Sequence, residues 1–227
     1  MNPFLKAALL TLVVVALALA MAAQLDAVRA SELRNSIDSA LFQNQERQVA
    51  LHFGRVMAND TAAQCAYLTR MRAKQLNDTY PLALKIQDYE KNNLFNSEYE
   101  NIKTTYFLGV ADSYISVFEQ QQACRSDEVP LLLVYREKSA CPECRAQNQI
   151  LSGLVAARCP NVRIYALPYD YPLMPLQMLA DRYNVSSESR MPVTVIDDKI
   201  RLDGLRSEDE LVAALVSRGA TCGPKQN

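Results

Sequence analysis

Two cysteines separated by two residues, Cys141 and Cys144, are the side chains of this sequence best suited to covalent chemistry. Thiol–disulfide exchange needs an exposed, stabilised thiolate and a second thiol that can displace a bound substrate. Pro142 favours a helix that starts directly after Cys141, because proline suits the first helical position. The unpaired N–H groups at that helix start would stabilise an anion on Cys141. The spacing therefore predicts Cys141 as the nucleophile and Cys144, one turn later, as the resolving thiol.

The segments around this pair predict an α/β domain. A short apolar, β-rich run directly precedes the cysteines, and strands alternate with helices after them. The expected strands are residues 129–135, 162–167, 193–196 and 199–202, and the expected helices are residues 142–157, 173–183 and 207–216. Ser207 and Glu210 are spaced as a capping box at the start of the last helix. Asp197 and Asp198 mark a hairpin turn, so the expected order is β-α-β-α-β-β-α.

This order, with Cys-Pro-Glu-Cys after the first strand and a proline before the third, resembles the thioredoxin-like superfamily between residues 128 and 216. The resemblance implies a cis peptide bond between Met191 and Pro192, a conformation almost confined to proline. It also implies that the Met191 backbone pairs with an extended substrate segment, as in strand addition. Pro142 and Glu143, which stand between the cysteines, complete the expected substrate-binding residues.

Several positions depart from the family pattern. Ala140 stands where a tryptophan often precedes the first cysteine, and Tyr135 stands where thioredoxins have a buried acid. Glu137 and Glu143 are the nearest carboxylates in the sequence; either could accept a proton, but solvation at the surface is the role we favour for both. These departures leave the direction of electron flow open.

Residues 27–124 show a helical pattern, which predicts three to five packed helices before the α/β domain. One expected helical face consists of Tyr99, Ile102, Tyr106, Val110, Tyr114 and Val117, at the spacing of a single side of a helix. Residues 59–61 and 77–81 have the composition of turns and are expected to separate helices. In the family's disulfide oxidases a helical part is inserted within the fold, whereas here it precedes the fold.

The N-terminus predicts a membrane anchor or an export signal. Lys6 precedes residues 7–23, which are apolar and carry no charge. This length lies between the core of a signal peptide and a spanning helix, so both a retained anchor and a cleaved signal stay open. Both interpretations place the residues from about Gln24 onward outside the cytoplasm. The expected parts are therefore residues 1–24 as anchor or signal, 25–126 as a helical domain and 127–227 as a thioredoxin-like domain.

The four other cysteines of the six are expected to form structural disulfides, which suits an exported chain. Cys65 and Cys124 both fall in the helical segment, and a bond between them would tie it together. In the proposed fold, Cys159 ends the helix that begins at Cys141, and Cys222 follows the last helix to the same far end. A second disulfide is therefore expected between Cys159 and Cys222. The alternative is that Cys159 is a buried apolar residue and Cys222 a free thiol in the tail.

Composition restricts the other classes of function. The formal net charge of −1 gives no support to nucleic-acid binding, and the single histidine, His52, excludes sites with several histidines. No glycine-rich phosphate loop follows a strand, and no second Cys-x-x-Cys pair completes a zinc ribbon, so neither cofactor nor metal is expected. The sequence favours a thiol–disulfide oxidoreductase that acts on protein thiols and disulfides and is reset by a membrane redox partner. The alternative is a redox-inert thioredoxin-like module that docks partners through its helical domain.

Overall fold

The computed structural model describes residues 61–137 and 141–224, together with Leu12, 15–17, Leu19, Met21 and Gln24. Most of the expected N-terminal anchor, the expected helices before Thr61, and His52 lie outside the described residues. Within the part that is described, no helix combines the length and the apolar character needed to cross a membrane. The chain divides into two compact units, residues 1–57 and 58–227. The second unit contains the cysteine pair.

A mixed four-stranded sheet in the order β2-β1-β3-β4 forms the centre of the second unit. β1 (Val129–Tyr135) pairs in parallel with β2 (Val162–Pro168) and antiparallel with β3 (Val193–Ile196). β4 (Ile200–Asp203) pairs antiparallel with β3 at the edge. β1 reads VPLLLVY and is buried over its first six residues, as is typical of a central strand covered on both faces.

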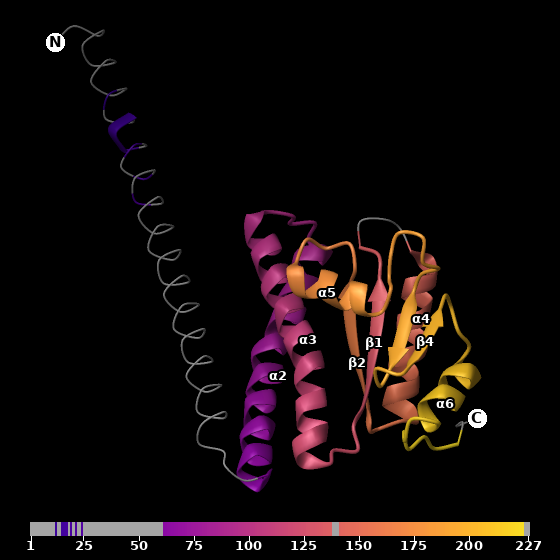
Figure 1. The fold of residues 1–227 in the computed structure, drawn as a ribbon. Helices are drawn as coiled ribbons and strands as arrows, with labels where there is room; N and C mark the ends of the chain where they lie inside the picture. The colour runs from indigo at the N-terminus through magenta and orange to yellow at the C-terminus, as the bar shows by residue number, and fades with distance from the viewer. Residues whose placement is uncertain are drawn as a thin grey trace, which may run out of the picture. The chain divides into compact units, whose positions relative to one another are not determined.

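Helices cover both faces of this sheet (Figure 1). α3 (Ser97–Cys124) and α5 (Met174–Arg182) pack on the face that carries Leu132 and Val134. α4 (Pro142–Ala157) and α6 (Glu208–Val216) pack on the face that carries Leu131 and Leu133. Because successive side chains of a strand point to opposite faces, one apolar strand serves two hydrophobic cores. The element order after residue 128 is β-α-β-α-β-β-α.

α2 (Thr61–Lys91) packs along α3, and it corrects one expectation from the sequence. The expected turn at residues 77–81 is wrong, because α2 continues through Pro81. The Thr79 hydroxyl donates to the Gln75 carbonyl at 2.7 Å, within the same helix. A Cβ atom on Gly109 would lie 2.6 Å from that hydroxyl, so a glycine on α3 lets the two helices approach closely here. This packing outweighs the local helix-breaking signal of the proline.

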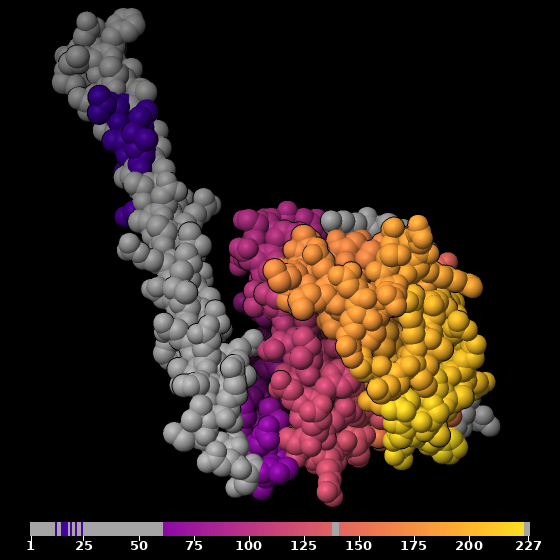
Figure 2. Space-filling model, viewed as in Figure 1, coloured from indigo at the N-terminus to yellow at the C-terminus, as the bar shows by residue number. Residues whose placement is uncertain are grey.

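The expected apolar face of α3 is directed into the core. Tyr99, Val110, Tyr114 and Val117 are buried, as is Phe107, which the six-residue pattern omits. The rings of Tyr114 and Tyr165 meet edge to face, with centroids 5.4 Å apart. In the space-filling view, α3 and α5 lie against each other (Figure 2).

A buried arginine joins the helical pair to the sheet. Arg72 of α2, with 7 % of its side chain exposed, forms an ion pair with Glu128 at the entrance of β1. It also donates to the Tyr165 hydroxyl of β2 at 2.6 Å and to the Gln120 side chain of α3 at 2.5 Å. A charge at this depth needs such partners to compensate for the loss of its hydration. The expected boundary between residues 126 and 127 therefore falls inside one compact unit.

Two disulfides are remote from Cys141. Cys65 is bonded to Cys124, with Cα atoms 5.0 Å apart, and Cys159 is bonded to Cys222, with Cα atoms 4.2 Å apart. These are the pairings that the sequence favours. α4 separates Cys159 from Cys141 by 16 helical residues, or about 24 Å of helix, so the second disulfide closes the end of the fold opposite to Cys141.

Candidate active site

Cys141 caps the start of α4, directly after the loop that follows β1. Its Sγ accepts a hydrogen bond from the Cys144 backbone N–H at 3.3 Å, and its carbonyl accepts bonds from the N–H groups of Cys144 and Arg145. Pro142 occupies the first turn of the helix, where a missing N–H costs nothing. This geometry aims a helix start and its partial positive charge at the Cys141 sulfur.

The two cysteines form a disulfide in this structure, with Cα atoms 5.2 Å apart. They differ in exposure: Cys141 is partly exposed, whereas Cys144 is buried, with 6 % of its surface accessible. An incoming thiolate must reach a sulfur along the S–S axis, so the accessible sulfur is the one that an external thiol can attack. The assignment of Cys141 as the nucleophile and Cys144 as the resolving thiol stays a prediction.

The loop before β3 lies opposite the cysteine pair. The Met191–Pro192 peptide bond is cis, and the pairing of Val134 with Val193 brings the start of β3 beside the end of β1. The N–H of Gly204, a residue with a φ of +78°, donates to the Arg190 carbonyl at 2.9 Å and to the Pro192 carbonyl at 2.7 Å. The loop is thereby fixed to the end of β4.

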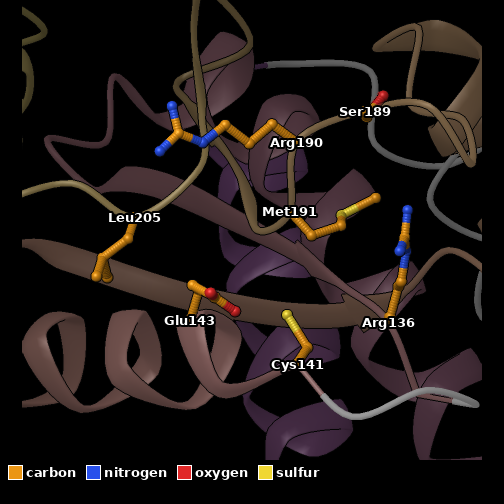
Figure 3. Close-up of a pocket in the computed structure, with 7 residues that line it drawn as sticks. All are labelled: Arg136, Cys141, Glu143, Ser189, Arg190, Met191 and Leu205. Atoms are coloured by element: carbon orange, nitrogen blue, oxygen red, sulfur yellow. The ribbon is translucent and has the colours of Figure 1, made fainter.

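A cleft of about 320 Å³ opens between this loop and the start of α4 (Figure 3). Its lining residues are Arg136, Cys141, Glu143, Ser189, Arg190, Met191 and Leu205. The structure thus brings Cys141, Glu143 and Met191 together around one space, with the Met191 side chain opposite the Cys141 sulfur. Cys144, Pro142 and Pro192 adjoin these residues in the chain but do not line the cleft.

Four lining residues were not among the expected site residues: Arg136, Ser189, Arg190 and Leu205. Arg136 follows β1 directly, and Ser189 and Arg190 precede the cis proline, so their proximity to the two motifs in sequence was an available signal. Leu205 follows β4 and carries no such signal, because only the β3–β4 hairpin returns it to the cleft.

Glu137 occupies a different environment from the one expected. It forms an ion pair with Lys103 of α3, and only 19 % of the Glu137 side chain and 12 % of the Lys103 side chain are exposed. The Glu137 N–H also donates to the Asp170 carboxylate at 2.9 Å. The expectation of a solvated Glu137 is therefore wrong, because α3 covers the start of the loop that leads to Cys141. Glu143, by contrast, is exposed.

Burial shifts the pKa values of two groups next to this loop. It lowers the pKa of the Lys103 amine, while the carboxylates of Glu100, Glu90 and Asp170 act in the opposite direction. Burial also raises the pKa of Tyr135 well above its usual range. Tyr135 is therefore a neutral phenol at physiological pH. It cannot accept a proton from a cysteine thiol as a carboxylate would.

Among residues 61–137 and 141–224, no cluster of three or more histidine, cysteine or acidic side chains is arranged to hold a metal ion. Cys159, which a four-thiolate site with Cys141 and Cys144 would need, is bonded to Cys222 at the far end of α4. In comparisons with known proteins, no protein-family model matches the chain, and no curated protein and no solved structure is significantly similar to it.

Proposed function

We propose that this protein is a thiol–disulfide oxidoreductase with a thioredoxin-like domain, and that Cys141 and Cys144 exchange disulfides with protein substrates. The observation that carries the proposal is the pair itself. An accessible Cys141 caps a helix start, a buried Cys144 follows within one turn, and both adjoin a cleft formed by a loop with a cis proline. A purely structural disulfide would not need this difference in exposure or an open cleft beside it.

Oxidation of a substrate by this pair proceeds in two exchanges. A substrate thiolate attacks the Cys141 sulfur, the Cys141–Cys144 bond breaks, and Cys144 leaves as a thiolate that takes up a proton. A second substrate thiolate then attacks the substrate sulfur of the mixed disulfide and releases Cys141 as a thiolate. The substrate loses two electrons and two protons, and the pair gains two electrons. Reduction of a substrate disulfide follows the same steps in reverse.

The helix start assists both directions. When Cys141 is the leaving or attacking thiolate, the N–H of Cys144 and the positive helix end stabilise its charge. Met191 lines the cleft, and in this proposal its backbone pairs with an extended substrate segment. The reduction potential of the pair relative to its surroundings sets the direction of flow.

The proposed location is the extracytoplasmic side of a membrane. The apolar residues 7–23 after Lys6 support an anchor or an export signal, and two disulfides remote from the cleft suit an oxidising compartment. Such an enzyme needs a redox partner in the membrane to restore Cys141 and Cys144 after each cycle.

The test is an exchange assay on the full chain purified in detergent. We expect it to reduce insulin with dithiothreitol or to oxidise a dithiol peptide, and Cys141→Ser to abolish both activities. The double variant with Cys65→Ser and Cys124→Ser is the matched control, because it removes a disulfide remote from the cleft. A folded wild-type protein without either activity would refute the proposal and leave the redox-inert docking module. If the pair is active, equilibration with glutathione buffers gives its reduction potential.

A further inference from the structure

Two arginines lie on opposite sides of the Cys141 sulfur in the cleft. Arg136 extends from the end of β1 on the side of Ser189, and Arg190 extends from the loop before Pro192 on the side of Leu205 (Figure 3). Glu143 is the one acidic side chain among the seven lining residues, so the lining carries a net positive charge although the whole chain has a formal net charge of −1.

Arg136 is held in place. Its Nη2 donates to the Ser187 carbonyl at 2.5 Å, and its guanidinium carbon lies 6.0 Å from the centroid of the Tyr169 ring. A guanidinium has five N–H groups, and the one on Nε is buried without a partner in the described part of the chain. The group is therefore oriented by the protein and keeps donors for an additional acceptor.

The charge of Arg190 has no acidic partner among the residues that the structure describes. Across residues 61–137 and 141–224, no carboxylate forms an ion pair with its guanidinium. Its side chain is supported by Gly204, where a Cβ atom would lie 2.8 Å from the Arg190 Nε. The glycine thus makes room for the arginine stem, and the charged end of the side chain is left for a ligand.

Resting on the proposed function, we propose that the cleft selects substrate cysteines that have acidic residues on both sides in an extended segment. In such a segment the residues two before and two after the cysteine point to the same side as its sulfur, about 6.6 Å away along the chain. With the substrate sulfur on Cys141, these side chains are directed toward Arg136 and Arg190. The planar arginine fork matches a carboxylate with two parallel hydrogen bonds, which makes Asp or Glu the fitting residue.

The test uses blocked peptides that carry one cysteine as a mixed disulfide with thionitrobenzoate. The Cys141 thiolate attacks the peptide sulfur, forms a Cys141–peptide disulfide and releases the coloured thionitrobenzoate anion. The Cys144→Ser background stops the reaction at this product. Three peptides differ only in the residues two positions before and two positions after the cysteine. Both of these residues are Glu in the first peptide, Gln in the second and Lys in the third. Each rate is divided by the rate of the same peptide with dithiothreitol, which removes differences in intrinsic reactivity.

We expect the Glu peptide to react faster than the Lys peptide by about tenfold at low salt, with each exposed charge pair contributing about 1.5-fold to fivefold. Arg190→Gln should reduce the ratio of the Glu-peptide rate to the Lys-peptide rate by about 1.5-fold to fivefold. Arg70→Gln, the same charge change on α2, should leave this ratio unchanged. Salt at about 1 M, where the Debye length is about 3 Å, should remove most of the preference.

Equal normalised rates for the three peptides, or an Arg190→Gln ratio equal to that of Arg70→Gln, would overturn the inference. The Gln peptide separates this failure from failure of the proposed function. If the Gln peptide reacts in a Cys141-dependent manner and the Glu and Lys peptides react at equal normalised rates, the exchange activity stands and the selectivity does not. If no peptide reacts through Cys141, the proposed function itself is wrong.

Discussion

Replacing Lys103 by methionine should destabilise the fold through the carboxylate that it leaves behind. Glu137 would keep a charge with only 19 % of its side chain exposed, and its Oε2 is already buried without a hydrogen-bond partner in the described part of the chain. Removal of one partner from a fully buried pair costs about 3–5 kcal/mol. Because this pair retains some exposure, we expect a loss of about 2–4 kcal/mol in the free energy of unfolding.

The measurement is denaturant unfolding followed by far-ultraviolet circular dichroism, since the chain has no tryptophan. For a compact unit of this size the loss corresponds to a fall in Tm of roughly 4–16 °C. Lys74→Met is the matched control, because the Lys74–Asp78 pair has side chains that are about half exposed and such pairs contribute about 1 kcal/mol or less.

A second variant keeps this prediction falsifiable. Combining Lys103→Met with Glu137→Met replaces the ion pair by two apolar side chains, which should restore most of the lost stability. Because the pair fixes the loop before Cys141, Lys103→Met should also change the alkylation rate of Cys141 in the reduced protein, and the double variant should not restore it fully. The reasoning is refuted if Lys103→Met is as stable as Lys74→Met, or if the double variant is no more stable than the single one.

In the reduced protein, iodoacetamide should modify Cys141 about tenfold faster than Cys144, because Cys141 is partly exposed at the helix start whereas Cys144 is buried; equal rates measured by peptide mapping would remove the assignment of the nucleophile. Arg72→Met should lower the free energy of unfolding by about 2–4 kcal/mol, since it leaves the Glu128 carboxylate, with 16 % of its side chain exposed, without its main partner; a loss under 1 kcal/mol in guanidinium would contradict this. Hydrogen bonds from an arginine and a tyrosine hold the pKa of Asp198 below its usual range. The Asp198 carboxylate therefore stabilises the fold above its unfolded pKa of about 3.9, and this contribution disappears as the pH falls through the lower folded pKa. Asp198→Asn should cost about 0.5–1 kcal/mol at pH 7 and flatten the acid part of the stability curve; an unchanged acid slope would count against it.

The elements that local signals define were predictable from the sequence. α4 begins at the expected Pro142 and β1 spans the expected apolar run, since each depends on residues that adjoin in the chain. The capping box of α6 is present, with Ser207 accepting from the Glu210 N–H and the Glu210 carboxylate accepting from the Ser207 N–H. Such bonds span three residues and need no knowledge of the tertiary fold.

The features that the sequence could not reveal depend on distant residues. The helix that continues through Pro81 packs closely at Thr79 against Gly109, which lies on another helix. The burial of Glu137 needs Lys103, and nothing in the local sequence of either residue indicates the other. In both cases tertiary packing overrides a local preference, as is common where two elements cover each other.

The C-terminal tail is fastened at the end of the fold opposite to the cleft. Cys222 is bonded to Cys159, and the Gly223 N–H donates to the Arg158 carbonyl at 2.8 Å. A protein coupled to a solid support through its last residues would therefore present the cleft to solution rather than to the support.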